Sequence, residues 1–274
     1  MKAVSLVRNI AVGIQKTISK QFVNPYKKVG FSWMQTRVVK NLPFDKNQSI
    51  NFFNHQLFFK RRDELLNSIN EIFIEEIYKQ TLPSLPYIID CGANIGLSVI
   101  YLKRLFPDST ILAFEPDESN YQILEKNIAS FHLDNVLLKK EAVWIDDTVL
   151  SFANTNTQMS KIDTSPNNNT IQVKAVRLKN LLNRKVDFLK IDIEGAEFEV
   201  MKDIDNSLQN VHHLFVEYHG TFRQNKELNE IFEIITKSGF QYYIQQAIEK
   251  HPTPYLPSFT ADYDIQLNIY CFRN

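Results

Sequence analysis

The chain has 274 residues, of which 44% are hydrophobic and 23% charged, as expected for a globular protein with one large domain and an appendage. Its 31 basic residues balance 31 acidic ones, which argues against a protein that binds duplex nucleic acid. The isolated cysteines Cys91 and Cys271 lack metal-ligand spacing and suit a reducing cytoplasm. No apolar run approaches the roughly 18 residues of a membrane span, and no signal peptide is predicted.

Residues 1–84 are predicted to form a basic arm and a helical extension ahead of the main domain, residues 85–274. The first acidic residue is Asp45, so eight basic residues give the arm, residues 1–40, a net charge of +8. With its scattered Val, Ile and Leu, the arm could make weak contact with an anionic membrane surface or form a solvated or partner-packed helix. An apolar-rich segment at 62–79 predicts a helix before two prolines.

From Tyr87 onward, short buried-type runs alternate with helix-length segments, a pattern that predicts βαβ units and a parallel sheet. The predicted strands are 87–91, 110–115, 135–143, 186–193, 212–218, 240–246 and 264–273, and the predicted helices are 96–106, 118–131, 195–203 and 225–238. The last two strands are joined by a proline-rich segment without a helix, so the final strand should run antiparallel. Two extra strands, 149–153 and 170–178, flank a polar loop, 154–169, that we expect to act as a lid.

The few glycines of the chain gather where strands end. Of the seven, Gly92, Gly96, Gly195 and Gly220 follow predicted strands, and open α/β sheets bind ligands at these carboxyl ends. The first loop, residues 90–96 (DCGANIG), lacks the G-x-G-x-x-G fingerprint that cradles a pyrophosphate. It begins instead with Asp90, whose carboxylate disfavours phosphate but suits a water or a cationic amino group. S-adenosylmethionine, with an amino-acid tail and no phosphate, meets this requirement.

Two further strand ends complete the predicted cofactor site. Glu115 ends the second strand, 25 residues after Asp90, where an acid in nucleotide-binding sheets accepts hydrogen bonds from ribose hydroxyls. At the end of the third strand, Ala142 is small enough to admit an adenine ring, and Glu141 can meet a ring amine.

Candidate catalytic groups stand at the ends of the fourth and fifth strands. Lys190, Asp192 and Glu194 alternate along one face, and charges in an apolar strand are costly unless they are paired or functional. His219 is predicted to be the general base, with Asp192 orienting its ring or positioning the methyl-bearing end of the donor. A structural Lys190–Asp192 ion pair stays open, as does a divalent cation on Asp192 with Glu194 or Glu217, although the spacing demands no metal.

Three segments, residues 90–96, 114–116 (FEP) and 187–197 (DFLKIDIEGAE), resemble the FkbM family of class I methyltransferases. The similarity runs from about residue 70 to the end of the chain. It implies a Rossmann-like α/β fold: a seven-stranded, mostly parallel sheet with an antiparallel last strand and helices on both faces. It also implies S-adenosylmethionine as methyl donor and, usually, O-methylation of sugars or natural products.

Residue by residue, the resemblance places Asp90, Gly92, Asn94 and Gly96 beside the methionine part of the donor and Glu115 beside its ribose. The expected partner is therefore a small-molecule or glycan acceptor. A non-catalytic cofactor-binding interaction protein is an alternative, and a nicotinamide-dependent oxidoreductase is another, although its fingerprint is absent.

Overall fold

The computed structural model describes residues 25–31, 33–43, 45–153, 170–248, 253, 255–256 and 263–273. The chain divides into two compact units after Ile77, a few residues ahead of the predicted boundary at residue 84. The predicted lid, 154–169, and residues 1–24 of the basic arm lie outside the described residues. Within the described part, no helix combines the length and the apolar character needed to cross a membrane.

The N-terminal unit combines short helices with a β-hairpin. Its elements are η1 (Pro25–Val29), α2 (Trp33–Asn41), β1 (Gln48–Phe52), β2 (His55–Phe59), α3 (Arg62–Ile69) and the π-helical turn η2 (Asn70–Ile74). Aromatic rings form its core, with ring centroids 5.4 Å apart for Phe31 and Phe52 and 5.0 Å apart for Phe52 and Phe73. The helix predicted at 62–79 was wrong in its last turn, because the wide turn ends at Ile74 and Glu76 adopts a left-handed φ of 57°.

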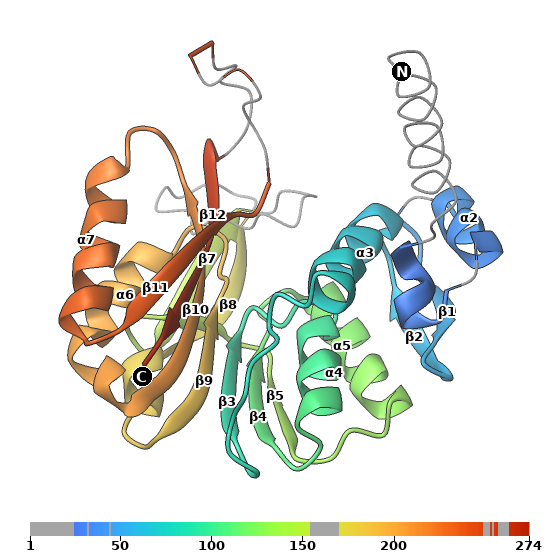
Figure 1. Cartoon of the computed structure of the whole chain (residues 1–274), viewed down its shortest axis with the longest axis horizontal. Helices are drawn as coiled ribbons and strands as arrows, with labels where there is room; N and C mark the ends of the chain where they lie inside the picture. The colour runs from blue at the N-terminus through green and yellow to red at the C-terminus, as the bar shows by residue number, and fades with distance from the viewer. Residues whose placement is uncertain are drawn as a thin grey trace, which may run out of the picture. The chain divides into compact units, whose positions relative to one another are not determined.

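The C-terminal unit is built on a seven-stranded sheet (Figure 1) of order β11-β12-β10-β9-β3-β4-β5. Its strands are β3 (Tyr87–Cys91), β4 (Thr110–Phe114), β5 (Val136–Lys139), β9 (Val186–Ile191), β10 (Val211–Gly220), β11 (Gln241–Gln246) and β12 (Ile265–Phe272). The five strands from β10 to β5 pair in parallel, whereas β12 runs antiparallel to both of its neighbours. The predicted fold class, with its reversed last strand, is confirmed.

Helices cover both faces of this sheet: α4 (Leu97–Leu105) and α5 (Glu118–Ser130) lie on one face, and α6 (Glu197–Ile204) and α7 (Asn225–Lys237) on the other (Figure 1). The short helices η3 (Leu178–Leu181) and η4 (Asp205–Asn210) precede β9 and β10. Helix α5 begins where it does because the Asp117 side chain accepts a hydrogen bond from the backbone N–H of Asn120 at 2.8 Å, a helix cap.

A separate three-stranded sheet of order β6-β8-β7 begins directly after β5 in the chain. It comprises β6 (Ala142–Trp144), β7 (Thr148–Ala153) and β8 (Thr170–Arg177). The single strand predicted at 135–143 was therefore wrong, because β5 and β6 belong to different sheets. The break falls at Lys140 and Glu141, which form ion pairs with Glu118 and Lys174, respectively, instead of continuing a buried strand.

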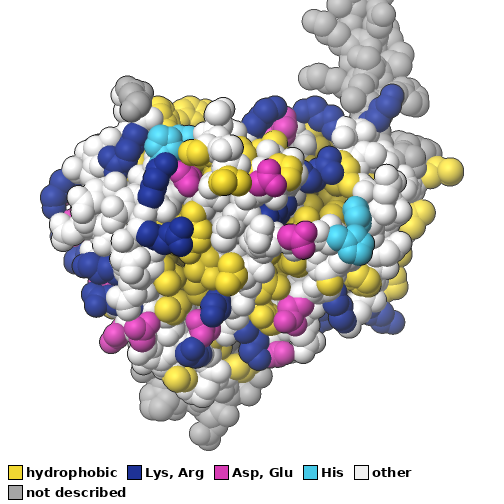
Figure 2. Space-filling model, turned by 90° about the horizontal axis from the view of Figure 1, so that it is seen from below, with side chains coloured by type: hydrophobic (Ala, Val, Ile, Leu, Met, Phe, Trp, Pro, Cys, Tyr) yellow, Lys and Arg dark blue, Asp and Glu magenta, His cyan; other side chains and the backbone are white. Residues whose placement is uncertain are grey.

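Strand β9 is buried along its whole length and occupies the middle of the sheet. It pairs in parallel with β10, and Ile191 lies opposite Val216, so the carboxyl ends of the predicted fourth and fifth strands are neighbours. At the surface, the face shown in Figure 2 carries basic and acidic side chains interspersed among apolar ones. This mixture agrees with the balanced charge of the chain.

Candidate active site

A cavity of about 780 Å³ opens at the carboxyl ends of the central strands of the C-terminal unit. Its size is within the range of small-molecule and cofactor sites. The cavity brings together most of the residues predicted from the sequence: Gly92, Asn94, Glu115, Glu141, Ala142, Asp192 and His219. Both predicted catalytic residues and most predicted cofactor residues thus face one space.

Two predicted cofactor residues, Asp90 and Gly96, do not line this cavity. Asp90 is fully buried, where it accepts a hydrogen bond from Ser98 Oγ at 2.5 Å and lies 3.1 Å from Lys190 Nζ. Gly96 has a φ of 92° at the start of α4, and a side chain there would meet Leu124. Both residues lie behind the residues that line the cavity, and they shape the loop that faces it.

The loop after β3 packs tightly against the end of β9. Gly92 has a φ of 95°, and a Cβ at this position would lie 1.8 Å from the backbone oxygen of Asp192, so only glycine fits. The backbone N–H groups of Gly92 and Ala93 both donate to Phe114 O. The loop is therefore tied to the ends of both neighbouring strands.

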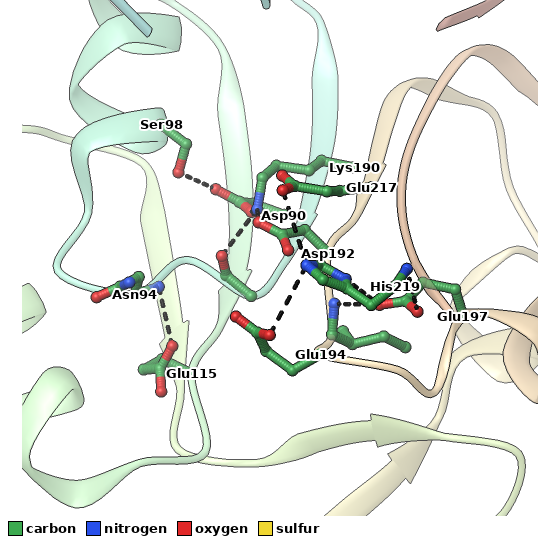
Figure 3. Close-up of polar contacts among 12 residues, drawn as sticks. Asp90, Asn94, Ser98, Glu115, Lys190, Asp192, Glu194, Glu197, Glu217 and His219 are labelled. Carbon is green, nitrogen blue, oxygen red and sulfur yellow. Dashed lines mark hydrogen bonds and ion pairs between the residues drawn. The ribbon is translucent and has the colours of Figure 1, made fainter. Parts of the chain in front are cut away.

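Lys190 holds this junction together from inside the sheet (Figure 3). Its side chain is 2% exposed, and Nζ lies 3.1 Å from Asp90 Oδ1, 3.1 Å from Asp192 Oδ2 and 2.8 Å from Gly92 O. Burial alone would lower the pKa of Lys190, but Asp192 and Asp90 raise it well above its ordinary value. The ion pair considered from the sequence is present, and it extends to a second carboxylate, that of Asp90.

Glu115 presents a buried carboxylate at the end of β4. It is 6% exposed, and its two oxygens accept hydrogen bonds from the backbone N–H groups of Asn94 and Asp117, each at 2.9 Å. Burial raises the pKa of Glu115 to about 7. A carboxylate oxygen accepts more than one hydrogen bond, so Glu115 can also receive hydroxyl donors from the cavity.

The small sheet supplies a largely apolar wall. Ala142 is buried at the start of β6, and the same wall includes Trp144, Leu150, Ile171 and Val173. Glu141 lies beside them and forms an ion pair with Lys174. Such a wall suits an uncharged ring, with one acidic group at its edge.

Glu197, the first residue of α6, is a buried hub at the other side of the cavity. Its carboxylate accepts hydrogen bonds from the backbone N–H of Ile193 at 3.1 Å and of Gly195 at 3.0 Å. His219 N donates to Oε2 at 3.3 Å, and His219 Nδ1 lies 3.2 Å from Oε1. One side chain therefore joins the loop after β9 to the imidazole at the end of β10.

The other ring nitrogen of His219, Nε2, lies near the carboxylates of Glu194 and Glu217 (Figure 3). The ring is 2% exposed, and Nε2 lies 3.7 Å from both Glu194 Oε2 and Glu217 Oε1. Burial raises the pKa of Glu194 to about 7 and that of Glu217 to about 8.

The carboxylates around His219 influence the protonation of its ring. Burial alone would lower the pKa of the imidazole, but the hydrogen bond and charge of Glu197, with the charges of Glu194 and Asp192, raise it to about 10. The role of His219 as general base stays a prediction. Glu197, rather than Asp192, orients the ring.

Glu197 and Tyr263 were not predicted as site residues. Tyr263 lines the cavity, donates its hydroxyl to Glu194 O at 2.5 Å and stacks at a tilt 5.2 Å from the His219 ring. For Glu197 a signal existed, since an acid opens the helix directly after a buried strand and a glycine. Tyr263 lies in a proline-rich segment whose sequence gives no such signal.

The fold and the cavity define a Rossmann-like α/β protein with a ligand site at the carboxyl ends of its parallel strands. Residues 90–242, more than half of the chain, match the family model described as the methyltransferase FkbM domain. The chain therefore belongs to the FkbM family of methyltransferases.

Two curated relatives come from fungi. Methyltransferase 1 of Beauveria bassiana is 29% identical over 163 residues, a match that covers 50% of this chain and 66% of that protein. Methyltransferase sdnD of Sordaria araneosa is 30% identical over 179 residues, covering 49% of this chain and 67% of that protein. The chain thus spans about two thirds of the length of each.

Solved structures are more distant. The methyltransferase FkbM from Methylobacillus flagellatus is 17% identical, with a TM-score of 0.49, and the match covers 74% of this chain and 48% of that one. The M. jannaschii protein TYW2, in complex with AdoMet, is 12% identical, with a TM-score of 0.45, covering 85% of this chain and 89% of that one.

Proposed function

We propose that the chain is an S-adenosylmethionine-dependent O-methyltransferase that acts on a hydroxyl of a sugar, glycan or natural product. The observation that carries this proposal is the division of one cavity between two kinds of groups. The β3–β4 side offers a glycine loop and a buried acid for a donor without phosphate. The β9–β10 side offers a cluster of acids and a histidine for an acceptor.

The residues of the β3–β4 side fit the donor. Gly92 and Asn94 would lie along its methionine part, Glu115 would accept hydrogen bonds from its ribose, and Ala142 and Glu141 would meet its adenine. When bound, the donor supplies a methyl group activated by a positively charged sulfur. The nearby carboxylates favour a cation over an anion in this space.

The β9–β10 side would hold the acceptor. A hydroxyl acceptor must be aligned with the methyl group and must lose its proton as the new C–O bond forms and the S–C bond breaks. Asp192, Glu194 and His219 contribute side chains to the cavity here, so we place the acceptor hydroxyl against these three residues. This polar cluster favours catalysis over the alternative of a cofactor-binding interaction protein, which would need none of it.

The test supplies donor labelled in its methyl group together with a panel of sugars, glycans and hydroxylated natural products, with amines as the comparison. Mass spectrometry then locates the label. We expect consumption of the donor and a label on oxygen in at least one product. Label on nitrogen would contradict O-methylation, and binding of NAD in place of S-adenosylmethionine would favour the oxidoreductase alternative.

A further inference from the structure

Three side chains at the acceptor side of the cavity are arranged like the ligands of a metal ion. One donor atom from each of Asp192, Glu194 and His219 lies within 4.8 Å of the other two. Two carboxylates and an imidazole form a donor set that binds divalent ions such as Mn²⁺. The three come from the loop after β9 and from the end of β10, two segments that Glu197 joins.

A second observation concerns the histidine itself. Its ring is 2% exposed, yet among the described residues Nε2 makes no hydrogen bond, since the carboxylate oxygens of Glu194 and Glu217 are 3.7 Å away. Glu194 Oε2 is also buried without a hydrogen-bond partner in the described part of the chain. Buried polar atoms of this kind normally have a partner. A cation between Nε2 and Glu194 would supply it, in place of a proton on that nitrogen.

The opposite ring nitrogen is held as in metal-binding histidines. Nδ1 of a ligating histidine commonly bonds a carboxylate, which fixes the ring and leaves Nε2 for the ion. Here Glu197 fills that position, 3.2 Å from Nδ1, and is itself anchored by backbone N–H groups. Glu197 is thus a positioning residue for His219.

The charge of the cluster also favours a cation. Acidic side chains predominate around His219: Asp192, Glu194, Glu197 and Glu217. The buried lysine nearby, Lys190, is shared between Asp192 and Asp90. Lys190 Nζ lies 3.1 Å from Oδ2 of Asp192, and a carboxylate has a second oxygen that can bind an ion.

We propose that Asp192, Glu194 and His219 Nε2 bind one divalent cation of the Mg²⁺ or Mn²⁺ type, which presents its remaining coordination positions to oxygens of the acceptor. Neighbouring hydroxyls on a sugar would supply oxygen ligands of the kind that such an ion prefers. Coordination also lowers the pKa of a bound hydroxyl, so its proton can pass to water. The role toward the acceptor rests on the proposed function, whereas the binding of the ion does not.

The experiment titrates Mn²⁺ into the chelator-treated full chain and follows free and bound ion by electron paramagnetic resonance. We expect one bound ion per chain. Asp192→Asn and Glu194→Gln should each weaken binding at least about tenfold, and Glu197→Gln about tenfold. The matched control is Glu118→Gln, which removes a cavity-lining acid outside the cluster and should leave binding unchanged. Circular dichroism verifies that each variant is folded.

The electron paramagnetic resonance spectrum of bound Mn²⁺ distinguishes a direct ligand from a residue that only supports the structure. Coupling of bound Mn²⁺ to an imidazole nitrogen should appear in the wild type and vanish in His219→Gln. Absence of stoichiometric binding, a coupling that survives His219→Gln, or equal loss in Glu118→Gln would overturn the site. Because donor and acceptor are absent from these titrations, their result is independent of the proposed function, which is tested by donor binding and transfer.

Discussion

The buried lysine in β9 offers a sharp test of how the site is built. Lys190→Met removes the ammonium but keeps much of the apolar stem, so the change is mainly electrostatic. It leaves Asp90, which is fully buried, with only the hydrogen bond from Ser98, and it leaves Asp192 without its cation. Gly92 O also loses a donor at 2.8 Å.

The expected cost follows from burial. Removing one partner of a buried ion pair typically costs about 3–5 kcal/mol of the free energy of unfolding, because an uncompensated charge stays inside. Lys185 pairs with Asp187 at 2.8 Å, but its side chain is 68% exposed. Lys185→Met, the matched control, should therefore cost about 1 kcal/mol or less.

Urea unfolding of the C-terminal unit, followed by circular dichroism, measures both changes. The double variant Lys190→Met/Asp90→Asn also removes the buried charge of Asp90, and it should recover at least about 1 kcal/mol of unfolding free energy relative to Lys190→Met alone. The reasoning is refuted if Lys190→Met costs no more than Lys185→Met, or if Asp90→Asn makes the Lys190→Met protein less stable.

Three further predictions concern single residues. Gly92→Ala should destabilise the protein by more than about 2 kcal/mol, because its Cβ would meet the backbone oxygen of Asp192. Gly30→Ala, at a φ of 81° with no atom within 4 Å of the added Cβ, should cost about 1 kcal/mol, and equal losses in urea unfolding would contradict the argument. Burial raises the pKa of Glu115 to about 7, so the folded state holds its proton more tightly than the unfolded state does. The resulting contribution to the free energy of unfolding is fully present below the unfolded pKa and is lost as pH rises through about 7. Unfolding of wild type and Glu115→Gln at a series of pH values should show the wild type losing up to about 3 kcal/mol relative to the variant across this window, and parallel curves would disprove it. His219→Ala should lower the single-turnover rate of methyl transfer at least about a hundredfold while donor affinity stays nearly unchanged, and a rate close to wild type would remove His219 from the chemistry.

The fold could be predicted because each buried strand is a short β-branched run and each helix is long enough to cross over between parallel strands. The errors occur where side-chain partners decide the path. Lys140 and Glu141 leave the main sheet for partners at Glu118 and Lys174, which are distant in sequence. The end of the 62–79 helix is set by a local turn at Glu76, which apolar periodicity does not reveal.

The site was predicted as a place more accurately than as a set of roles. Glycines and acids at strand ends show which edge of the sheet binds ligands. Alternation along a strand cannot tell which acid will reach an imidazole, and here Glu197, on a helix, does so in place of Asp192. Likewise the sequence predicts that Asp90 contacts the donor, but in the structure Asp90 is buried in an ion pair with its neighbour on β9, Lys190.

Isothermal titration of the folded chain with S-adenosylmethionine tests the central claim most directly. We expect one donor bound per chain, no binding of NAD, and a loss of about 1–3 kcal/mol of binding free energy in Glu115→Ala, because the hydrogen bonds to its charged carboxylate disappear. Glu125→Ala, which removes an exposed acid on α5, is the control and should bind like the wild type. Absence of donor binding, or an unchanged affinity in folded Glu115→Ala, would contradict the account.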